Sequence, residues 1–275
     1  GGNTGGSGGS GVVILSYPDV YAAPTSTTGS PTVSTSGSGS LAFTGATGNY
    51  IYYAGQTPFV FGTGDFTIEF WVYFNNFSGS PIILDWRSGG GNGAYPTFYV
   101  SGSNSMIYYA NATDAITSST LSTSTWYHVA LCRIGTSTKM YLNGTQSGST
   151  YSDTTNYLAN TSAPYIGSGG VSLNGNITNI RVVKGVGVYT GAFTSPTSPL
   201  TATQSAGTNI AAITGTQTSL LLNSVSGSRF ADTSTNSYVA NVQGSVMAWN
   251  QLSPFTGTGY KNRVYTWTSS GSITF

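Results

Sequence analysis

Few residues of this chain could perform acid–base chemistry. Its 275 residues include a single glutamate, Glu69, and a single histidine, His128. Glycoside hydrolysis needs two carboxyl groups at a set separation. Asp65 stands about 13 Å from Glu69 along one predicted strand, which is too far for the usual pair. Nothing in the sequence brings Asp85 beside Glu69. We expect His128 to be a half-buried strand histidine with a hydrogen-bond partner. These residues predict a protein that is not an enzyme.

The single cysteine and the low charge exclude further classes of site. Cys132 permits no intrachain disulfide and no cysteine-rich metal site, and its apolar neighbours predict a small buried hydrophobe. Only 5% of the residues are charged and the net charge is +1, so the chain has no basic surface for nucleic acid or for an anionic membrane. No apolar run reaches the length of a membrane span.

Aromatic residues offer a different chemistry, because apolar ring faces suit the C–H faces of sugars. Trp71 and Trp126 lie on strands where packing is the better interpretation. Trp86 is followed by Arg87 and a glycine-rich run, which indicates a surface position. The candidate carbohydrate-binding residues are Trp86, Arg87, Tyr95, Tyr108 and Tyr109.

Short apolar or alternating segments, separated by turns every 8–12 residues, must position these side chains. The clearest predicted strand covers residues 66–74, whose apolar residues at even positions share one face. Asn143-Gly144 predicts a hairpin. No segment has a helical period, so the pattern predicts an all-β sandwich or jelly roll. The other main predicted strands are 12–17, 41–43, 50–53, 81–86, 97–100, 106–109, 126–133, 138–142, 165–167, 176–183 and 220–222.

Three motifs carry a family resemblance. The first is the strand FTIEFWV at residues 66–72. The second is WYHVAL at residues 126–131 with the hairpin 140–144, and the third is residues 165–167 with 173–181. They occur in the order and spacing of a known domain. Residues 41–224 thereby resemble the laminin-G-like, concanavalin-A-like jelly roll. The resemblance implies an all-β sandwich, here with short flanking β segments.

A narrower resemblance concerns the flanks. Residues 181–190 and 193–200 look like the version of this domain in tail, fibre and decoration proteins of marine phages. Residues 1–20 are similar to the end of a glycine-rich β module, residues 21–40 read as a linker, and residues 261–275 are similar to the start of a further β module. Residues 225–260 are predicted to be an appended arm that packs on the jelly roll.

The resemblance also raises calcium, which laminin-G-like domains often hold at the rim of the sandwich. Thr44 and Asn49 stand where the family commonly has acidic residues, which weakens an inherited site. Asp85, Asp114 and Asp153 are the candidate metal ligands, since Ca²⁺ prefers carboxylate and carbonyl oxygens.

These observations favour a non-enzymatic structural and adhesive virion protein. We expect its partners to be further copies of itself in a homo-oligomer, other virion proteins and a host-surface glycan, with neither nucleic acid nor membrane insertion. The alternatives are a bacterial extracellular adhesin or matrix subunit, a glycan-binding module, and a residual glucanase.

Overall fold

The computed structural model describes residues 13–18, 26–28, 32–34, 39–53, 59–87, 94–158, 164–223, 231–244, 248–250, 252–255, 262–267 and 272–274. Every regular element within these ranges, apart from a single 3₁₀ position, is a β-strand. A helix with the length and apolarity of a membrane span does not occur among these residues.

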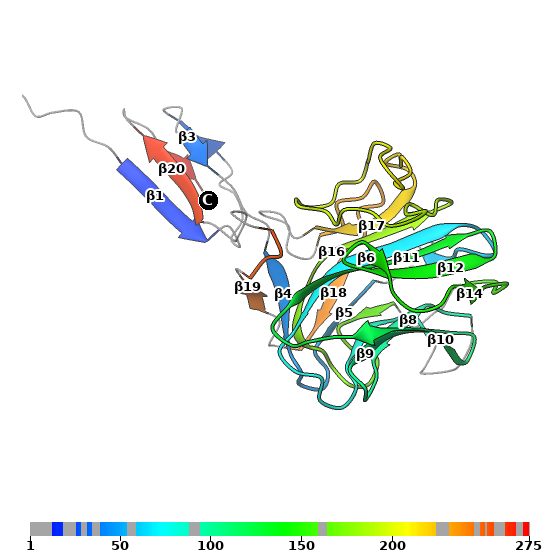
Figure 1. Cartoon of the computed structure of the whole chain (residues 1–275). Coiled ribbons are helices and arrows are strands. Elements are labelled where there is room, and N and C mark those ends of the chain that lie inside the picture. The colour runs from blue at the N-terminus through cyan, green and yellow to red at the C-terminus, as the bar shows by residue number, and fades with distance from the viewer. Residues whose placement is uncertain are drawn as a thin grey trace, which may run out of the picture.

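Two large antiparallel sheets pack face to face as a sandwich (Figure 1), which confirms the all-β fold class. The seven-stranded sheet has the order β10-β9-β8-β7-β15-β5-β18. Its strands are β5 (Tyr50–Tyr53), β7 (Ile82–Asp85), β8 (Thr97–Val100), β9 (Ser105–Ala110), β10 (Thr113–Thr120), β15 (Tyr165–Ile166) and β18 (Ala240–Gln243).

The nine-stranded sheet has the order β13-β12-β11-β6-β16-β4-β19, with β14 beside β12 and β17 beside β16. Its strands are β4 (Ser40–Thr44), β6 (Phe66–Phe74), β11 (Trp126–Ile134), β12 (Ser137–Leu142), β13 (Thr145–Gln146), β14 (Tyr151–Ser152), β16 (Asn174–Lys184), β17 (Thr218–Leu222) and β19 (Ala248–Asn250).

The main core lies between the sheets. The even-numbered apolar residues of β6 are fully buried there, as the alternation predicts. The odd-numbered residues Thr67, Glu69 and Trp71 point to the opposite face, yet they are also buried. The segment 185–217 lies over that outer face and forms a second, smaller apolar cluster with it, which includes Cys132, Val188 and Tyr189. The buried thiol of Cys132 confirms its prediction as a small core residue.

One β-bulge corrects the predicted alternation of β16. Thr178 pairs with Trp71 but Arg181 pairs with Glu69, so β16 contains one more residue than β6 over this interval. Asn179 adopts a left-handed conformation (φ 53°), as bulge residues often do. The extra residue turns Ile180 into the main core and places Arg181 on the outer face, opposite Glu69.

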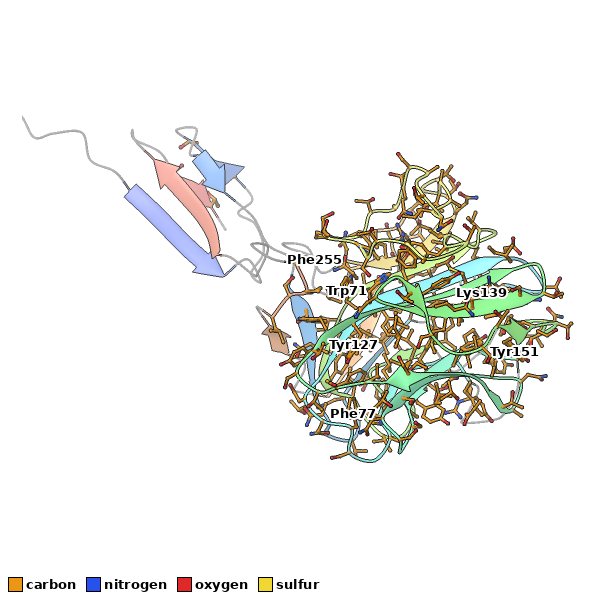
Figure 2. All side chains as sticks on the ribbon, in the orientation of Figure 1. Trp71, Phe77, Tyr127, Lys139, Tyr151 and Phe255 are labelled. Carbon is orange, nitrogen blue, oxygen red and sulfur yellow. The ribbon has the colours of Figure 1, made fainter. Side chains whose placement is uncertain are left out.

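The predicted arm contributes an edge strand to each sheet. β18 pairs with β5 and β19 pairs with β4. Near the start of the arm, the carboxylate of Asp232 accepts hydrogen bonds from the backbone N–H groups of Leu221, Ser234 and Tyr238, which fastens the arm to β17. Further along, Phe255 packs edge-on against Trp71 at 5.8 Å (Figure 2).

The flanking segments pair with each other. β1 (Val13–Pro18) and β3 (Thr32–Ser34) lie on either side of β20 (Asn262–Trp267) in a three-stranded sheet, and β2 (Ser26–Thr27) pairs with β21 (Ile273–Thr274). Figure 1 shows this sheet outside the sandwich. The described strands of the N-terminal and C-terminal flanks are thus hydrogen-bonded to each other. The predicted glycine-rich residues 1–12 lie outside the described residues.

The surroundings of Gly144 show how closely the segment 185–217, which covers the outer face, fits the nine-stranded sheet. The Asn143-Gly144 turn is a hairpin, as predicted, and both residues have positive φ. A Cβ at Gly144 would collide with the carbonyl oxygen of Phe193, whereas one at Gly135, also at positive φ, would meet nothing.

We expect Gly135→Ala to cost about 1 kcal/mol of unfolding free energy from backbone strain alone, and Gly144→Ala to cost about 2–4 kcal/mol. Denaturant unfolding measures both, and equal losses would contradict this close fit.

Candidate functional site

Glu69 is the centre of a buried polar cluster on the outer face of the nine-stranded sheet. Its Oε1 accepts a hydrogen bond of 2.7 Å from Nε of Arg181, and its Oε2 accepts one of 2.8 Å from the hydroxyl of Tyr189. Nε2 of His128 lies 3.1 Å from the same Oε2. His128 is therefore fully buried rather than half-buried.

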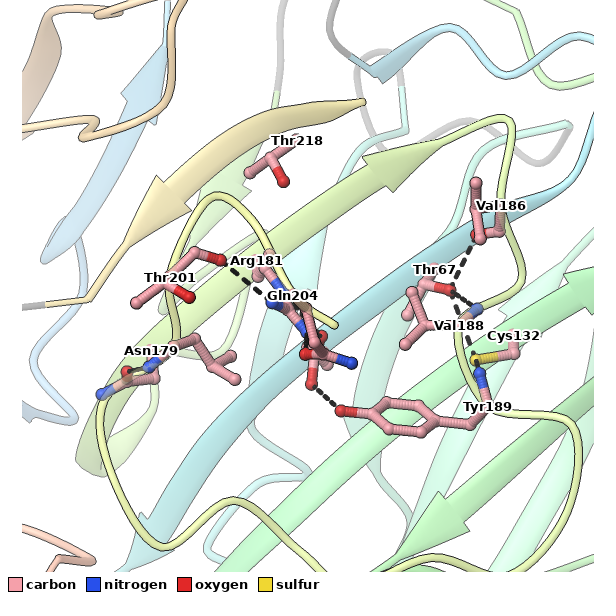
Figure 3. A network of polar contacts seen from close by, with 12 residues as sticks. Thr67, Cys132, Asn179, Arg181, Val186, Val188, Tyr189, Thr201, Gln204 and Thr218 are labelled. Carbon is pink, nitrogen blue, oxygen red and sulfur yellow. Dashed lines mark hydrogen bonds and ion pairs between the residues drawn. The ribbon is translucent and has the colours of Figure 1, made fainter. Parts of the chain in front are cut away.

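The same cluster holds the covering segment in place (Figure 3). Arg181 donates from Nη1 to the carbonyl oxygen of Thr201 and from Nη2 to Oε1 of Gln204. Thr67 binds the backbone of Val186 and Val188, and the backbone N–H of Tyr189 donates to Sγ of Cys132. These contacts are structural, because they leave Glu69 covered and its charge compensated.

Charge compensation fixes the protonation state of Glu69. Burial by itself raises the pKa of this carboxyl, but Arg181, His128 and Tyr189 together lower the pKa from its ordinary value of 4.5 to about 2. A glycosidase acid must hold a proton near neutral pH. Glu69 is ionised there and is not suited to that role.

Asp85 lies on the other side of the sandwich. Its neighbour Leu84 points into the core, and the Asp85 carboxylate lies on the outer face of the seven-stranded sheet. Glu69 and Asp85 therefore point away from each other across both sheets. They cannot flank one glycosidic bond.

Two predicted sugar-binding residues are buried. The ring of Trp86 is 3% exposed and packs on Phe59 and Phe61, so the predicted surface position of Trp86 is wrong. Tyr108 is fully buried and its hydroxyl contacts Tyr157. Tyr95 is partly buried and packs against the main core. The glycine run after Arg87 lies outside the described residues, and it was the feature that suggested exposure.

Arg87 and Tyr109 do lie together on the outer face of the seven-stranded sheet. The guanidinium of Arg87 binds both oxygens of Asp85 at 2.8 Å and stands 5.6 Å from the centre of the Tyr109 ring. The hydrogen bonds to Asp85 raise the pKa of Arg87. With Ser80, Ile82 and Tyr99, these two residues line a hollow of about 260 Å³.

This hollow continues a row of side chains that crosses the whole sheet. Strand register places one residue per strand in line, and residues directly opposite one another share a face. The row runs Asp114, Tyr109, Thr97, Asp85, Tyr165, Tyr52 and Asn241.

Three tyrosines form the aromatic part of this face, and sequence reasoning missed them. The ring of Tyr165 lies 4.9 Å from that of Tyr50 and 6.1 Å from that of Tyr52. All three side chains are partly exposed. The available signal was the alternation in residues 50–53, where Ile51 and Tyr53 are buried.

The three predicted calcium ligands do not form one site. Asp85 is engaged by Arg87 and by the hydroxyl of Thr97. Asp153 is fully buried and accepts hydrogen bonds from the hydroxyls of Thr138 and Tyr157. Asp114 is exposed and accepts one from Tyr99. No group of three acidic, histidine or cysteine side chains with the geometry of a metal site occurs among the described residues.

The family's calcium loop is also altered in this chain. Nδ2 of Asn49 donates to Oγ1 of Thr44, and Asn49 is buried. The two residues that replace the acidic positions are thus hydrogen-bonded to each other and carry no negative charge. The residues present do not fit a resident calcium ion.

The fold and its motifs define the class of protein. A family model for the concanavalin A-like lectin/glucanases superfamily, of laminin-G type, matches residues 44–186. The match covers about half of the chain, and the chain belongs to this family. No sequence among curated proteins matches it.

Solved structures give further likenesses. One is a protein of Bacteroides ovatus that is described as a candidate carbohydrate-binding protein. It is 15% identical to this chain, the alignment covers 86% of this chain and 60% of that one, and the TM-score is 0.46. Another is the heptameric SAP-like pentraxin of Limulus polyphemus, with 17% identity, 57% and 78% covered, and a TM-score of 0.40.

A third likeness is domain 4 of an extracellular arabinanase of Geobacillus stearothermophilus in complex with arabinotriose, with 13% identity, 63% of this chain and 82% of that domain covered, and a TM-score of 0.40. The chain spans 60% of the Bacteroides protein. At these identities and scores, none of these structures assigns a ligand to this chain.

The protonation of Glu69 predicts a stability change in acid. The folded pKa lies below the ordinary value, so the charged cluster stabilises the fold above about pH 4.5 and loses this contribution as the pH falls towards 2. The difference corresponds to about 3 kcal/mol. Urea unfolding of the wild type should show this loss. Glu69→Gln should be less stable than the wild type at pH 7, and its unfolding free energy should change less between pH 4.5 and pH 2. Asp114→Asn, at an exposed carboxylate, should keep the wild-type slope; a wild type with no loss would contradict the assignment.

Proposed function

We propose that this domain is a non-enzymatic glycan-binding module and that glycan binds on the outer face of the seven-stranded sheet. The observation that carries the proposal is the row of partly exposed tyrosines that continues into the hollow beside Arg87. At the usual strand spacing, the row from Asp114 to Tyr52 is about 24 Å long, which is enough for several sugar residues.

The chemistry of this face suits a sugar chain. Tyr50, Tyr52 and Tyr165 offer rings for stacking on pyranose C–H faces. Arg87 has five N–H donors, of which its side chain uses two on Asp85. The remaining donors, together with the Asp114 carboxylate, supply hydrogen bonds to hydroxyl groups. Asp85 holds the guanidinium in place before any sugar binds, which reduces the entropic cost of binding.

The opposite face supports a role without catalysis. The sole glutamate lies beneath the segment 185–217, with Arg181, Tyr189 and His128 around it. A hollow of about 220 Å³ within that segment is lined mostly by serine, threonine and proline, and its one aromatic residue, Tyr189, is buried. It offers neither a carboxylate pair nor an exposed ring.

Loss of either tyrosine should weaken binding. We expect Tyr165→Ala and Tyr52→Ala each to weaken binding about 5- to 100-fold, since an aromatic contact contributes about 1–3 kcal/mol. Tyr73→Ala is the control, because Tyr73 is partly exposed on the other sheet, where it contacts Trp126. A glycan array followed by calorimetry, with calcium and with a chelator, measures this. Equal affinity in both buffers is expected, and the absence of any bound glycan would overturn the proposal.

We propose further that the module belongs to a phage structural protein, as a fibre, tail or decoration component at the virion surface. Two observations support this role. The residues 181–200 resemble phage versions of the domain, and the flanking strands β1, β3 and β20 form a sheet that is separate from the two sheets of the sandwich. A bacterial extracellular adhesin or matrix subunit built from the same modules is the alternative.

Assembly and location test this role. We expect the purified full chain to form a homo-oligomer, often a trimer in fibres, in light scattering coupled to size-exclusion chromatography. We also expect its peptides in mass spectra of purified virions. A monomer that is absent from particles but present in a bacterial surface fraction would favour the adhesin instead.

A further inference from the structure

The charges on the proposed glycan face are few and can be assigned individually. Across all seven strands of this sheet the charged residues are Asp85 and Asp114, and no strand carries a basic residue. Arg87 lies two residues after the end of β7 and is the cation that lines the hollow. The ionic character of the face therefore depends on how these three groups pair.

Arg87 is compensated by Asp85. Its Nε and Nη2 each donate to a different carboxylate oxygen at 2.8 Å, and its backbone N–H donates to Asp85 as well. The Asp85 side chain is 3% exposed and that of Arg87 is 17% exposed. A bidentate pair of this kind leaves no net charge, so Arg87 presents N–H donors to the hollow without presenting an uncompensated cation.

Among the described residues, Asp114 has no such cationic partner. It lies on the edge strand β10, is exposed, and accepts a 2.8 Å hydrogen bond from the hydroxyl of Tyr99, which lines the same hollow. Burial and this hydrogen bond raise the pKa of Tyr99 to about 12, so the phenol stays neutral as a donor. The charges of Asp85, Arg87 and Asp114 leave one net negative charge at the hollow.

We infer that the hollow beside Arg87 takes a neutral sugar residue and discriminates against uronate and sulfated sugars. The inference rests on the proposed function, because it concerns the selectivity of the same face. A sugar hydroxyl both donates and accepts, and therefore suits the free N–H donors of Arg87 and the acceptor oxygens of Asp114 together. A carboxylate or sulfate accepts only, and Asp114 repels it.

Isosteric sugars that differ only at C6 test the selectivity. β-1,4-Mannotetraose and β-1,4-tetramannuronate form one pair, and cellotetraose and its C6-carboxylate counterpart form another. In calorimetric titrations at low salt, we expect the neutral member to bind about three- to tenfold more tightly, an effect typical of a solvent-exposed charge, and salt to reduce the ratio.

Asp114→Asn should remove the discrimination. The acidic member should then bind about as well as the neutral one, while the fold is retained. Asp65→Asn is the matched control: it changes the net charge equally, but Asp65 accepts from the backbone of Gly135 beside the nine-stranded sheet. This control should keep the wild-type ratio.

The outcomes separate the two proposals. If acidic oligosaccharides bind as tightly as neutral ones or more tightly, while Tyr165→Ala still weakens binding, the selectivity is overturned and the glycan face stands. If the ratio is as expected but Asp114→Asn leaves it unchanged, the assignment to Asp114 fails. If neither member of any pair binds and a broad array is also empty, both proposals fall together.

Discussion

The buried ion pair between Glu69 and Arg181 constrains the rest of this structure. Two charges that leave water lose several kcal/mol of hydration each, and their attraction offsets this loss only if further hydrogen bonds satisfy both groups. Here Tyr189, His128, Thr201 and Gln204 provide those bonds. Tyr189, Thr201 and Gln204 come from the segment 185–217, and His128 lies against it. The pair therefore requires that segment to remain closed over the nine-stranded sheet. One face of the sandwich is thereby occupied by the chain itself.

The bulge at Asn179 shows why this pair could not be foreseen. Strict alternation along residues 176–183 would turn Arg181 towards the core, and the sequence pattern predicted that alternation. The extra residue reverses the facing of Ile180 and Arg181, which removes a cation from the apolar core and sets it opposite Glu69. Long-range contacts stabilise the bulge, since Oδ1 of Asn179 accepts from the backbone N–H of Leu200. No local pattern encodes such a contact.

The elements themselves were predictable from the sequence to a large degree. Strands with strong apolar alternation, such as residues 66–74, and the turn at Asn143-Gly144 carry their own local signal. The polar edge strand β10 (Thr113–Thr120) was missed, because its residues have few apolar contacts to reveal it. Trp86 was misplaced for the opposite reason: a glycine run nearby suggested exposure, although packing on Phe59 and Phe61 from elsewhere in the chain buries the ring.

The candidate binding face follows from register, which is a property of strand pairs. Tyr52, Tyr165, Asp85 and Tyr109 are far apart in the sequence, and they share one row only because β5, β15, β7, β8 and β9 pair as they do. The low charge of the chain gains a physical meaning from this arrangement. The opposite face is covered by the segment 185–217, whereas the tyrosines of this face are partly exposed. The glycan binding that we propose here would depend on stacking and on hydroxyl hydrogen bonds. With one compensated cation and one carboxylate that has no cationic partner among the described residues, this face would, under the proposal, select sugars by the absence of charge.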